Sequence, residues 1–145
     1  MRAAYETHMA AVNGRDLEAV MAGFHDECYL EDLAFGLRLT GKDGVGRYYE
    51  RLFDMFRDAK MLIEAWAFGD DVAVIWGNYR VTVPGLFLGH SRSLGPMEIT
   101  SGATIASFKD GMLEGERIFL NLGSICDDVG VSIDQVRGAV RALMA

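Results

Sequence analysis

The sequence predicts an α+β domain in which helices come first and a long antiparallel sheet follows. Apolar residues recur at helical spacing in the first part of the chain, up to Phe56. From Met61 onward, runs rich in β-branched and aromatic residues alternate with short turns containing Gly and Asp. The 145 residues, 50% of them hydrophobic, suffice for one domain with a sizeable core. We therefore expect a single domain over residues 1–145, with a bent sheet that wraps the helices around a pocket.

Two helices are expected at the start of the chain. The first covers residues 2–12 and stops at Asn13-Gly14. The second begins after Asp16, which can cap it, and reaches His25. Each has one apolar face at helical spacing, formed by Tyr5, His8, Met9 and Val12 in the first helix and by Leu17, Val20, Met21 and Phe24 in the second.

A capping-box spacing marks the start of two further helices. Thr40 and Asp43 open the third helix, and Ser132 and Gln135 open a terminal helix. The apolar face of the third helix consists of Val45, Tyr48, Tyr49, Leu52, Phe53 and Phe56, and that of the terminal helix of Ile133, Val136, Val140 and Leu143.

Four long strands are expected in the second half of the chain. Residues 61–68 and 72–83 flank a Gly-Asp-Asp turn and should pair as a hairpin. Residues 97–108 and 112–122 flank a Lys-Asp-Gly turn and predict a second hairpin. A Gly-rich excursion over residues 84–96 connects the two hairpins.

The stretch YLEDLAFG, residues 29–36, carries two adjacent acids, Glu31 and Asp32, in a run of otherwise strand-forming and apolar residues. Successive side chains of a strand face opposite sides, so only one of these acids can point into a core. Because Asp is rarely buried without a partner, an edge strand with both acids in water is the alternative.

Composition and charge exclude several classes of function. The formal net charge is −7 and no basic run occurs, which argues against nucleic acid or an anionic membrane as a partner. No apolar run approaches the ~18 residues of a membrane span, and the first residues lack the apolar stretch of a signal peptide. Cys28 and Cys126 lie far apart without a CxxC motif, so we expect no disulfide framework and a cytoplasmic location.

The order of these elements resembles the nuclear-transport-factor-2-like (NTF2-like) superfamily, which includes ketosteroid isomerase, limonene epoxide hydrolase, scytalone dehydratase and the SnoaL-like polyketide cyclases. The similar features are the Asn-Gly turn, the Glu31-Asp32 strand, the Gly-Lys-Asp helix start and the four long strands. The ending, Phe119-Leu120-Asn121 followed by residues 122–130, resembles the SnoaL-like pattern most closely. The resemblance implies a cone of three N-terminal helices packed on a strongly curved, mostly antiparallel sheet, plus a C-terminal helix.

The resemblance also implies roles for particular residues. Asp32 falls where ketosteroid isomerase has an Asp that moves a proton next to a carbonyl, and burial in an apolar pocket would raise its pKa. His8 takes the place of a Tyr that stabilises the resulting negative charge, and Tyr49 matches a supporting Tyr. The isomerase's second donor, a protonated Asp, aligns near Thr104, and the acid/base Asp of the cyclases is matched by Asn121.

An amide such as Asn121 cannot exchange a proton at neutral pH, so proton transfer needs another group. Besides Asp32, the candidates are Glu64, Glu116 and His90. Regular strand alternation places Glu64 on the same face as Trp66, which makes it the preferred second acid. His90 lies in the Gly-rich excursion and fits a loop over the pocket.

The pocket is expected to have aromatic walls that bind a hydrophobic ligand. Asn78 and Arg80 alternate along a long strand. They are either polar groups of the pocket or lie at the solvent-exposed end of the strand. The aromatic candidates for the wall are Trp66, Trp76, Phe87, Phe108 and Phe119, each of which could instead belong to the core.

Two motifs have simpler explanations. Residues 36–43 fit GxxxxGK, but Asp43 follows where a P-loop needs a hydroxyl for magnesium, and an acid there would repel phosphates. The run His25-Asp26-Glu27-Cys28 can bind metals, yet His8 and His90 do not complete a ligand pattern. We expect neither a metal nor a cofactor.

The preferred function is a small cofactor-independent cyclase or isomerase that acts on a hydrophobic polyketide-derived or cyclic ketone by acid/base catalysis. An epoxide hydrolase or epoxide-opening ether cyclase, using Asp32 with a second carboxylate, is an alternative. A further alternative is a non-catalytic ligand-binding or dimerisation module, in which Val72, Val74 and Ile75 or their neighbours would be buried at an interface. A homodimer is expected, with the terminal helix as a candidate contact.

Overall fold

The computed structural model describes residues 1–85, 89 and 95–145 of the chain. These residues form five helices, α1 (Arg2–Gly14), α2 (Leu17–Ala22), α3 (Gly41–Met55), α4 (Leu122–Val129) and α5 (Ile133–Met144). They also form six strands, β1 (Phe24–Asp32), β2 (Leu37–Thr40), β3 (Lys60–Phe68), β4 (Val72–Thr82), β5 (Pro96–Lys109) and β6 (Met112–Phe119). None of the helices in this part of the chain has the length and apolar character needed to cross a membrane. Phe87 and His90 lie outside the described residues.

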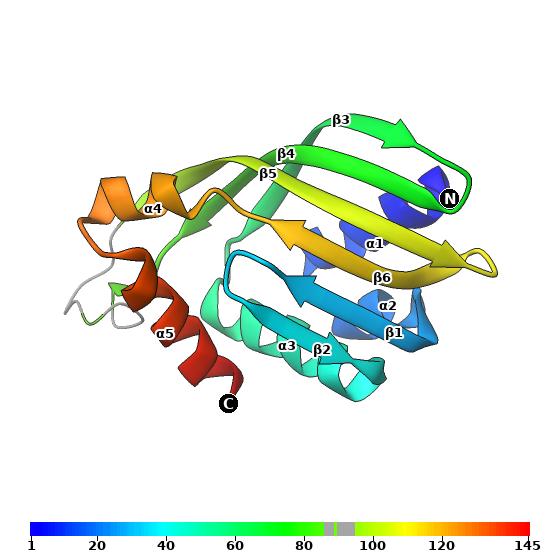
Figure 1. Cartoon of the computed structure of the whole chain (residues 1–145), viewed down its shortest axis with the longest axis horizontal. Coiled ribbons are helices and arrows are strands. Elements are labelled where there is room, and N and C mark those ends of the chain that lie inside the picture. Colours follow the sequence, from blue (N-terminus) through cyan, green and yellow to red (C-terminus); the bar gives the residue numbers. More distant parts are fainter. Residues whose placement is uncertain (86–88, 90–94) are drawn as a thin grey trace.

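The strands form one open, curved sheet in the order β2-β1-β6-β5-β4-β3 (Figure 1). Both expected hairpins are confirmed, since β3 pairs with β4 and β5 pairs with β6 in antiparallel register. The pairing of β1 with β6 is parallel, so the sheet is mostly antiparallel. Helices α1, α2 and α3 lie on one side of this sheet, and α4 and α5 lie at the end where β6 finishes (Figure 1).

The described residues contain five helices, one more than expected, because α4 forms a separate helix before α5. The second expected helix is also too long, since α2 ends at Ala22 and His25 lies in β1. Here a long-range partner overrides the helical spacing, because Phe24 pairs with Leu113 of β6. A second unexpected element is β2, which pairs with β1.

The two expected capping boxes have different outcomes. The box at α5 is confirmed, because the Ser132 hydroxyl accepts from the Gln135 backbone N–H and the Gln135 side chain accepts from the Ser132 N–H. The box at α3 is not formed, because the Thr40 side chain makes no capping hydrogen bond. Gly41, with φ of +71°, follows Thr40 directly and gives the backbone a tight entry into the helix.

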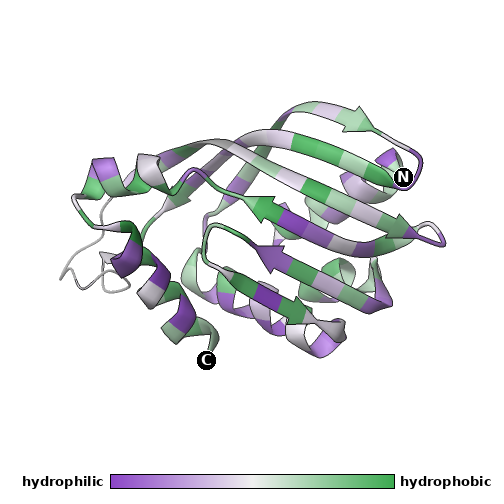
Figure 2. Ribbon diagram, viewed as in Figure 1, coloured by the Kyte–Doolittle hydropathy of each residue, from purple (hydrophilic) through white to green (hydrophobic). Residues whose placement is uncertain are grey.

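The core lies between the sheet and the helices. Buried residues of α1, α2 and α3 pack with the inward residues of the strands in one cluster, and a second cluster joins α4 and α5 to β4 and β5. Hydrophobic and hydrophilic residues alternate along much of the strands (Figure 2), as expected for a sheet with one buried and one exposed face. The sheet therefore presents its inward polar side chains to a largely apolar interior.

The end of α1 is tied to the start of β3 by one side chain. The Asn13 amide nitrogen donates to the Met61 carbonyl oxygen at 3.0 Å, and the Asn13 amide oxygen accepts from the Met61 N–H at 2.8 Å. Arg15 follows in the left-handed conformation, with φ of +56°, and reverses the chain toward α2. This clamp fixes the position of α1 relative to the sheet.

Candidate active site

The parallel pairing of β1 with β6 brings two acids to the inner face of the sheet. In this register Leu30 lies opposite Glu116 and Asp32 lies opposite Ile118. All four side chains are buried. Asp32 and Glu116 are thus diagonal neighbours on adjacent strands, each facing the helices.

Asp32 is fully buried and holds a hydrogen bond to the third helix. The Tyr48 hydroxyl donates to its Oδ2 at 2.8 Å, and the Phe35 backbone N–H donates to its Oδ1 at 3.3 Å. Burial raises the pKa of Asp32 from the ordinary 3.8 to about 6, although both hydrogen bonds oppose this shift. The inward orientation and raised pKa expected from the sequence are both present.

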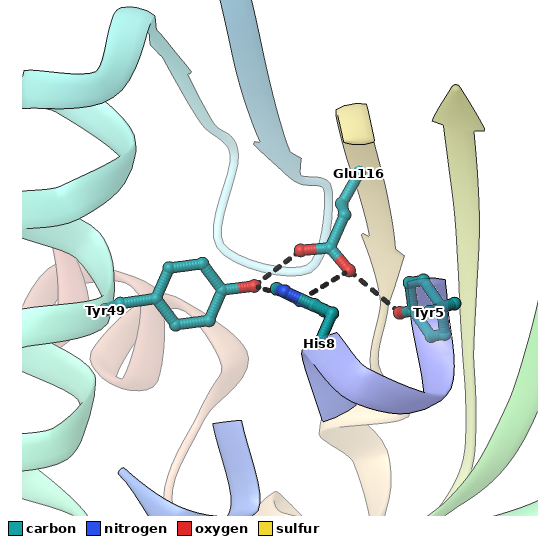
Figure 3. Close-up of polar contacts among 4 residues, drawn as sticks. All are labelled: Tyr5, His8, Tyr49 and Glu116. Carbon is teal, nitrogen blue, oxygen red and sulfur yellow. Dashed lines mark hydrogen bonds and ion pairs between the residues drawn. The ribbon is translucent and has the colours of Figure 1, made fainter. Parts of the chain in front are cut away.

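Glu116 is the centre of a second buried network (Figure 3). It accepts from the Tyr5 hydroxyl at 2.8 Å and from the Tyr49 hydroxyl at 2.5 Å. His8 Nε2 lies 3.5 Å from Glu116 Oε1 and 3.3 Å from the Tyr49 hydroxyl. Two residues of α1 and one of α3 therefore converge on one carboxylate of β6.

The network decides the ionisation state of Glu116. Burial by itself raises the pKa of this carboxyl. His8 and the tyrosine hydrogen bonds more than offset burial, so the pKa lies below its ordinary value of 4.5 and the group is ionised at neutral pH. The two inward acids therefore differ, with one pKa raised and the other lowered.

The buried tyrosines act as hydrogen-bond donors. Burial, followed by the nearby Glu116 or Asp32, raises the pKa of Tyr5, Tyr48 and Tyr49 well above the ordinary value. Their hydroxyls are therefore protonated at neutral pH. Within the described residues, His8 Nδ1 is buried and has no hydrogen-bond partner.

A cavity of about 120 Å³ lies between the helices and the sheet. Most of its lining is apolar, with residues from α1, α3 and the ends of the long strands. Its buried or half-buried polar groups include the hydroxyls of Tyr5, Tyr48, Tyr49, Tyr79 and Thr104 and the carboxylate of Glu116. Thr104 also interacts with the hydroxyls of Tyr5 and Tyr79.

Asp32 is not among the residues that line this cavity, whereas its partner Tyr48 is. A ligand in the cavity would therefore meet the Tyr48 hydroxyl before it met Asp32. His8 likewise stands behind Tyr49 and Glu116, which do line the cavity. Among the expected site residues, Tyr49, Thr104 and Glu116 face the cavity directly.

The expected second acid, Glu64, lies elsewhere. It is exposed, and its carboxylate accepts from the Asn78 side chain at 2.8 Å. Regular alternation would have put Glu64 beside Trp66, but a bulge between Ile63 and Ala65 breaks the alternation. Trp66 packs inward, edge-on to Tyr5 at 5.7 Å, while Glu64 stays outside. Neither lines the cavity.

Other expected pocket residues also lie away from the cavity. Trp76 and Phe119 are 41% exposed. Phe108 is buried in the core without lining the cavity. Asn121 is exposed and precedes α4, where its side chain makes no capping hydrogen bond.

Glu31, the other acid of the pair, is bonded to two arginines instead of lining the cavity. Its partners come from the two neighbouring strands, because Arg38 of β2 and Arg117 of β6 lie opposite it in the register. Arg117 Nε lies 2.6 Å and Arg38 Nη1 3.3 Å from its carboxylate. The alternation of side chains along β1 thus places Asp32 in the interior and Glu31 between two arginines.

The site residues that sequence reasoning missed are tyrosines. The sequence places Tyr48 only on the apolar face of the third helix, yet its hydroxyl bonds Asp32 and it lines the cavity. Neighbouring residues on a helix point about 100° apart, so Tyr48 and Tyr49 can each reach a different acid. The adjacent pair on one helix was therefore a usable signal. Among the described residues, no group of three or more His, Cys, Asp or Glu side chains could hold a metal ion.

Solved structures with a similar fold include a proposed SnoaL-like polyketide cyclase from Shewanella denitrificans OS-217, with a TM-score of 0.79 at 15% identity over 89% of this chain and 96% of that one. A protein from Catenulispora acidiphila with a ketosteroid isomerase-like fold, in complex with trimethylamine, has a TM-score of 0.76. It is 18% identical over 90% of this chain and 95% of that one. The epoxide hydrolase/cyclase-like enzyme of pyran ring formation in the polyether salinomycin has a TM-score of 0.71. It is 13% identical over 85% of this chain and 92% of that one.

At these identities the likeness to solved structures shows the NTF2-like fold and not the function. No curated protein matches the sequence. The family model of the SnoaL-like domain, however, matches residues 5–115, which span more than half of the chain, from the first turn of α1 to the start of β6. The chain therefore belongs to the SnoaL-like domain family.

Proposed function

We propose that the chain is a cofactor-independent enzyme that isomerises or cyclises a hydrophobic carbonyl compound by acid/base catalysis in the cavity. One observation carries the proposal. A buried carboxyl, Asp32, has a pKa of about 6 and is bonded to a hydroxyl, that of Tyr48, which lines an apolar cavity. A pKa near the working pH suits a group that must both accept and return a proton.

Asp32 would act as the base through Tyr48. In the proposed step, the Tyr48 oxygen accepts the proton from the carbon next to the carbonyl while the Tyr48 O–H proton moves to Asp32 Oδ2. The same two transfers in reverse return the proton to another atom of the ligand. The 2.8 Å hydrogen bond between Tyr48 and Asp32 provides the path for this exchange.

The negative charge that develops on the carbonyl oxygen needs hydrogen-bond donors. We propose that the hydroxyls of Tyr79 and Thr104 supply them, because both residues line the cavity and interact with each other. Glu116 would act as an orienting group, since it already accepts from Tyr5 and Tyr49 and holds both rings in the cavity wall.

Isotope exchange tests this proposal without knowledge of the natural substrate. In D₂O, the protein should accelerate deuterium incorporation next to the carbonyl of decalone, followed by NMR. Asp32→Asn and Tyr48→Phe should each reduce the accelerated rate by about 100-fold or more. Glu64→Gln, which changes an exposed acid outside the cavity, is the matched control. Exchange that is unchanged in Asp32→Asn would contradict the role of Asp32, and no acceleration by the parent protein would favour a non-catalytic binder.

A second candidate function is the opening of an epoxide by two carboxyl groups. The observation in its favour is that Asp32 has a raised pKa and Glu116 a lowered one, the pattern of an acid paired with a base. The fold similarity to the epoxide hydrolase/cyclase-like enzyme is in keeping with it. Here Glu116 would take a proton from the attacking water, and Tyr48 would donate its proton to the epoxide oxygen as the C–O bond breaks, while protonated Asp32 returns a proton to Tyr48. Hydrolysis of cyclohexene oxide that is lost in Glu116→Gln would favour this function over the first.

We further propose that the chain is one domain over residues 1–145 and forms a homodimer in the cytoplasm. The segment after the family match contributes Glu116 to the site and Val136 to the cavity wall, which supports a single unit. Both cysteines, Cys28 and Cys126, are free thiols, in keeping with a reducing compartment. The outer face of the sheet is the proposed contact between the two subunits.

A further inference from the structure

The cavity has an unusual distribution of charge along its lining. Of the described residues that line it, two are exposed to solvent, Arg15 and Lys60, and both are cationic. The remaining lining residues are buried or half-buried, and most of them are apolar. Exposed lining residues mark the opening of a cavity, so the opening lies between the turn after α1 and the start of β3. The charged group inside, Glu116, has the opposite sign.

Hydrogen bonds fix the backbone of Arg15 and the side chain of Lys60 near the opening. Arg15 is the C-cap of α1, and its backbone N–H donates to the Val12 carbonyl oxygen at 3.0 Å. Lys60 Nζ donates to the backbone carbonyl oxygen of Asn13. The side chain of Asn13 in turn clamps Met61, the residue after Lys60. Arg15 and Lys60 therefore lie in one hydrogen-bonded corner of the fold, between the end of α1 and the start of β3.

These cations have no carboxylate of their own. In the described part of the chain, no Asp or Glu lies within ion-pair distance of Arg15 or Lys60, although many other basic residues have such a partner. Arg15 does interact electrostatically with Asp58, whose pKa is lowered mainly by hydrogen bonds from Thr82 and, more weakly, by Arg15. The Asp58 carboxylate is already bonded to the Thr82 N–H at 2.9 Å and to the Thr82 hydroxyl at 2.5 Å. Within the described residues, the two cations of this corner are therefore not neutralised by an ion pair.

We propose that the cavity takes an apolar ligand with one anionic group, a carboxylate or another oxyanion, which stays at the opening between Arg15 and Lys60. The inference rests on the proposed function in taking the cavity as the ligand site, and it adds the class and the orientation of the ligand. Ionised Glu116 repels an anion from the interior, so the apolar end enters and the charged end remains outside. The reacting part of the ligand is thereby directed toward Tyr48.

Two fluorescent probes with the same aromatic body test the inference. Anilinonaphthalenesulfonate carries one negative charge, and phenylnaphthylamine is its uncharged counterpart. In the double variant R15Q/K60Q, the affinity for the sulfonate should fall about fivefold to tenfold, and the affinity for the uncharged probe should change less than about twofold. The matched control is R47Q/R51Q, which removes two exposed cations of α3 that do not line the cavity.

The outcomes separate this inference from the proposed function. Val12→Trp, which narrows the opening, should weaken both probes, because Val12 lines the cavity. The inference is overturned if the parent protein does not bind the sulfonate, if Val12→Trp leaves its binding intact, or if R15Q/K60Q weakens both probes equally or no more than the control. Probe binding needs no turnover, so a failed decalone exchange with a selective sulfonate site would refute the reaction and leave the ligand class standing.

Discussion

At the scale of single residues, Asp32 stands out because its position costs folding free energy. The carboxyl is fully buried, and two hydrogen bonds do not compensate for the lost hydration, since the pKa stays raised. The folded state therefore binds a proton more tightly than the unfolded state does. Such a cost is common at functional sites, where a stability optimum is given up for chemistry.

The raised pKa of Asp32 predicts how stability depends on pH. Between pH 3.8 and about 6 the folded protein binds more protons at this site than the unfolded chain, so stability falls as the pH rises through this window. This shift in the pKa of Asp32 corresponds to about 3 kcal/mol of folding free energy. Asp32→Asn should therefore raise the free energy of unfolding at pH 7.5, by up to this amount, and change it little at pH 4.

Urea unfolding of Asp32→Asn and the parent protein at several pH values measures this difference. The control is Asp26→Asn in the same strand, where an exposed acid pairs with Lys42 and the effect should stay below about 1 kcal/mol. A destabilised Asp32→Asn protein at pH 7.5 would mean that the carboxylate is better solvated than its burial indicates.

The pKa of Glu116 makes stability depend on pH in the opposite direction. Its pKa is lowered in the folded state, so its contribution to stability is present at neutral pH and is lost as the pH falls below the ordinary 4.5. Glu116→Gln replaces charge-assisted hydrogen bonds from Tyr5 and Tyr49 with neutral ones and should cost about 2 kcal/mol at pH 7. A double-mutant cycle with Tyr49→Phe should show coupling of at least about 1 kcal/mol. Glu50→Gln, an exposed acid beside Tyr49, should have no such coupling.

At the scale of elements, the bulge that separates Glu64 from Trp66 depends on a close contact between β3 and β4. A Cβ atom on Gly77 would lie 2.0 Å from the Leu62 carbonyl oxygen, so only glycine fits at this position. Gly77→Ala should destabilise the protein by about 3 kcal/mol. Gly138→Ala makes the same chemical change in α5, where nothing lies within 4 Å, and should stabilise it by about 0.5–1 kcal/mol. Urea midpoints of the two variants test the pair, and equal midpoints would contradict the packing argument.

The same bulge explains why the fold could be predicted better than the site. Local spacing and turn residues were enough for α1, α3, α5 and both hairpins, because these depend on neighbours in the sequence. The parallel pairing of β1 with β6, which places Asp32 beside Glu116, depends on residues far apart in the chain. A one-residue irregularity in β3 turns Trp66 inward while Glu64 stays on the outer face, and no residue type in that strand predicts this.

At the scale of the whole molecule, the outer face of the sheet bears an apolar row that the helices do not cover. The register aligns Trp76 of β4 with Ala103 of β5 and Phe119 of β6. Leu62 and Leu33 add exposed apolar area, at 40% and 44% exposure. Val72 also has 36% exposure, whereas Ile75 faces the core and is fully buried, so it takes no part in a contact of this face.

We expect this row to be the contact between two copies of the chain. A two-fold axis near Trp76 would bring the apolar row of one copy onto that of the other, because such interfaces are formed by the same patch on both subunits. Trp76→Glu should convert the dimer to a monomer at micromolar concentration, as measured by light scattering after size exclusion. Arg80→Glu, on the same strand outside the row, should leave the dimer intact. If the proposed chemistry is contained within one subunit, the Trp76→Glu monomer should retain decalone exchange, and its loss would place part of the site in the partner.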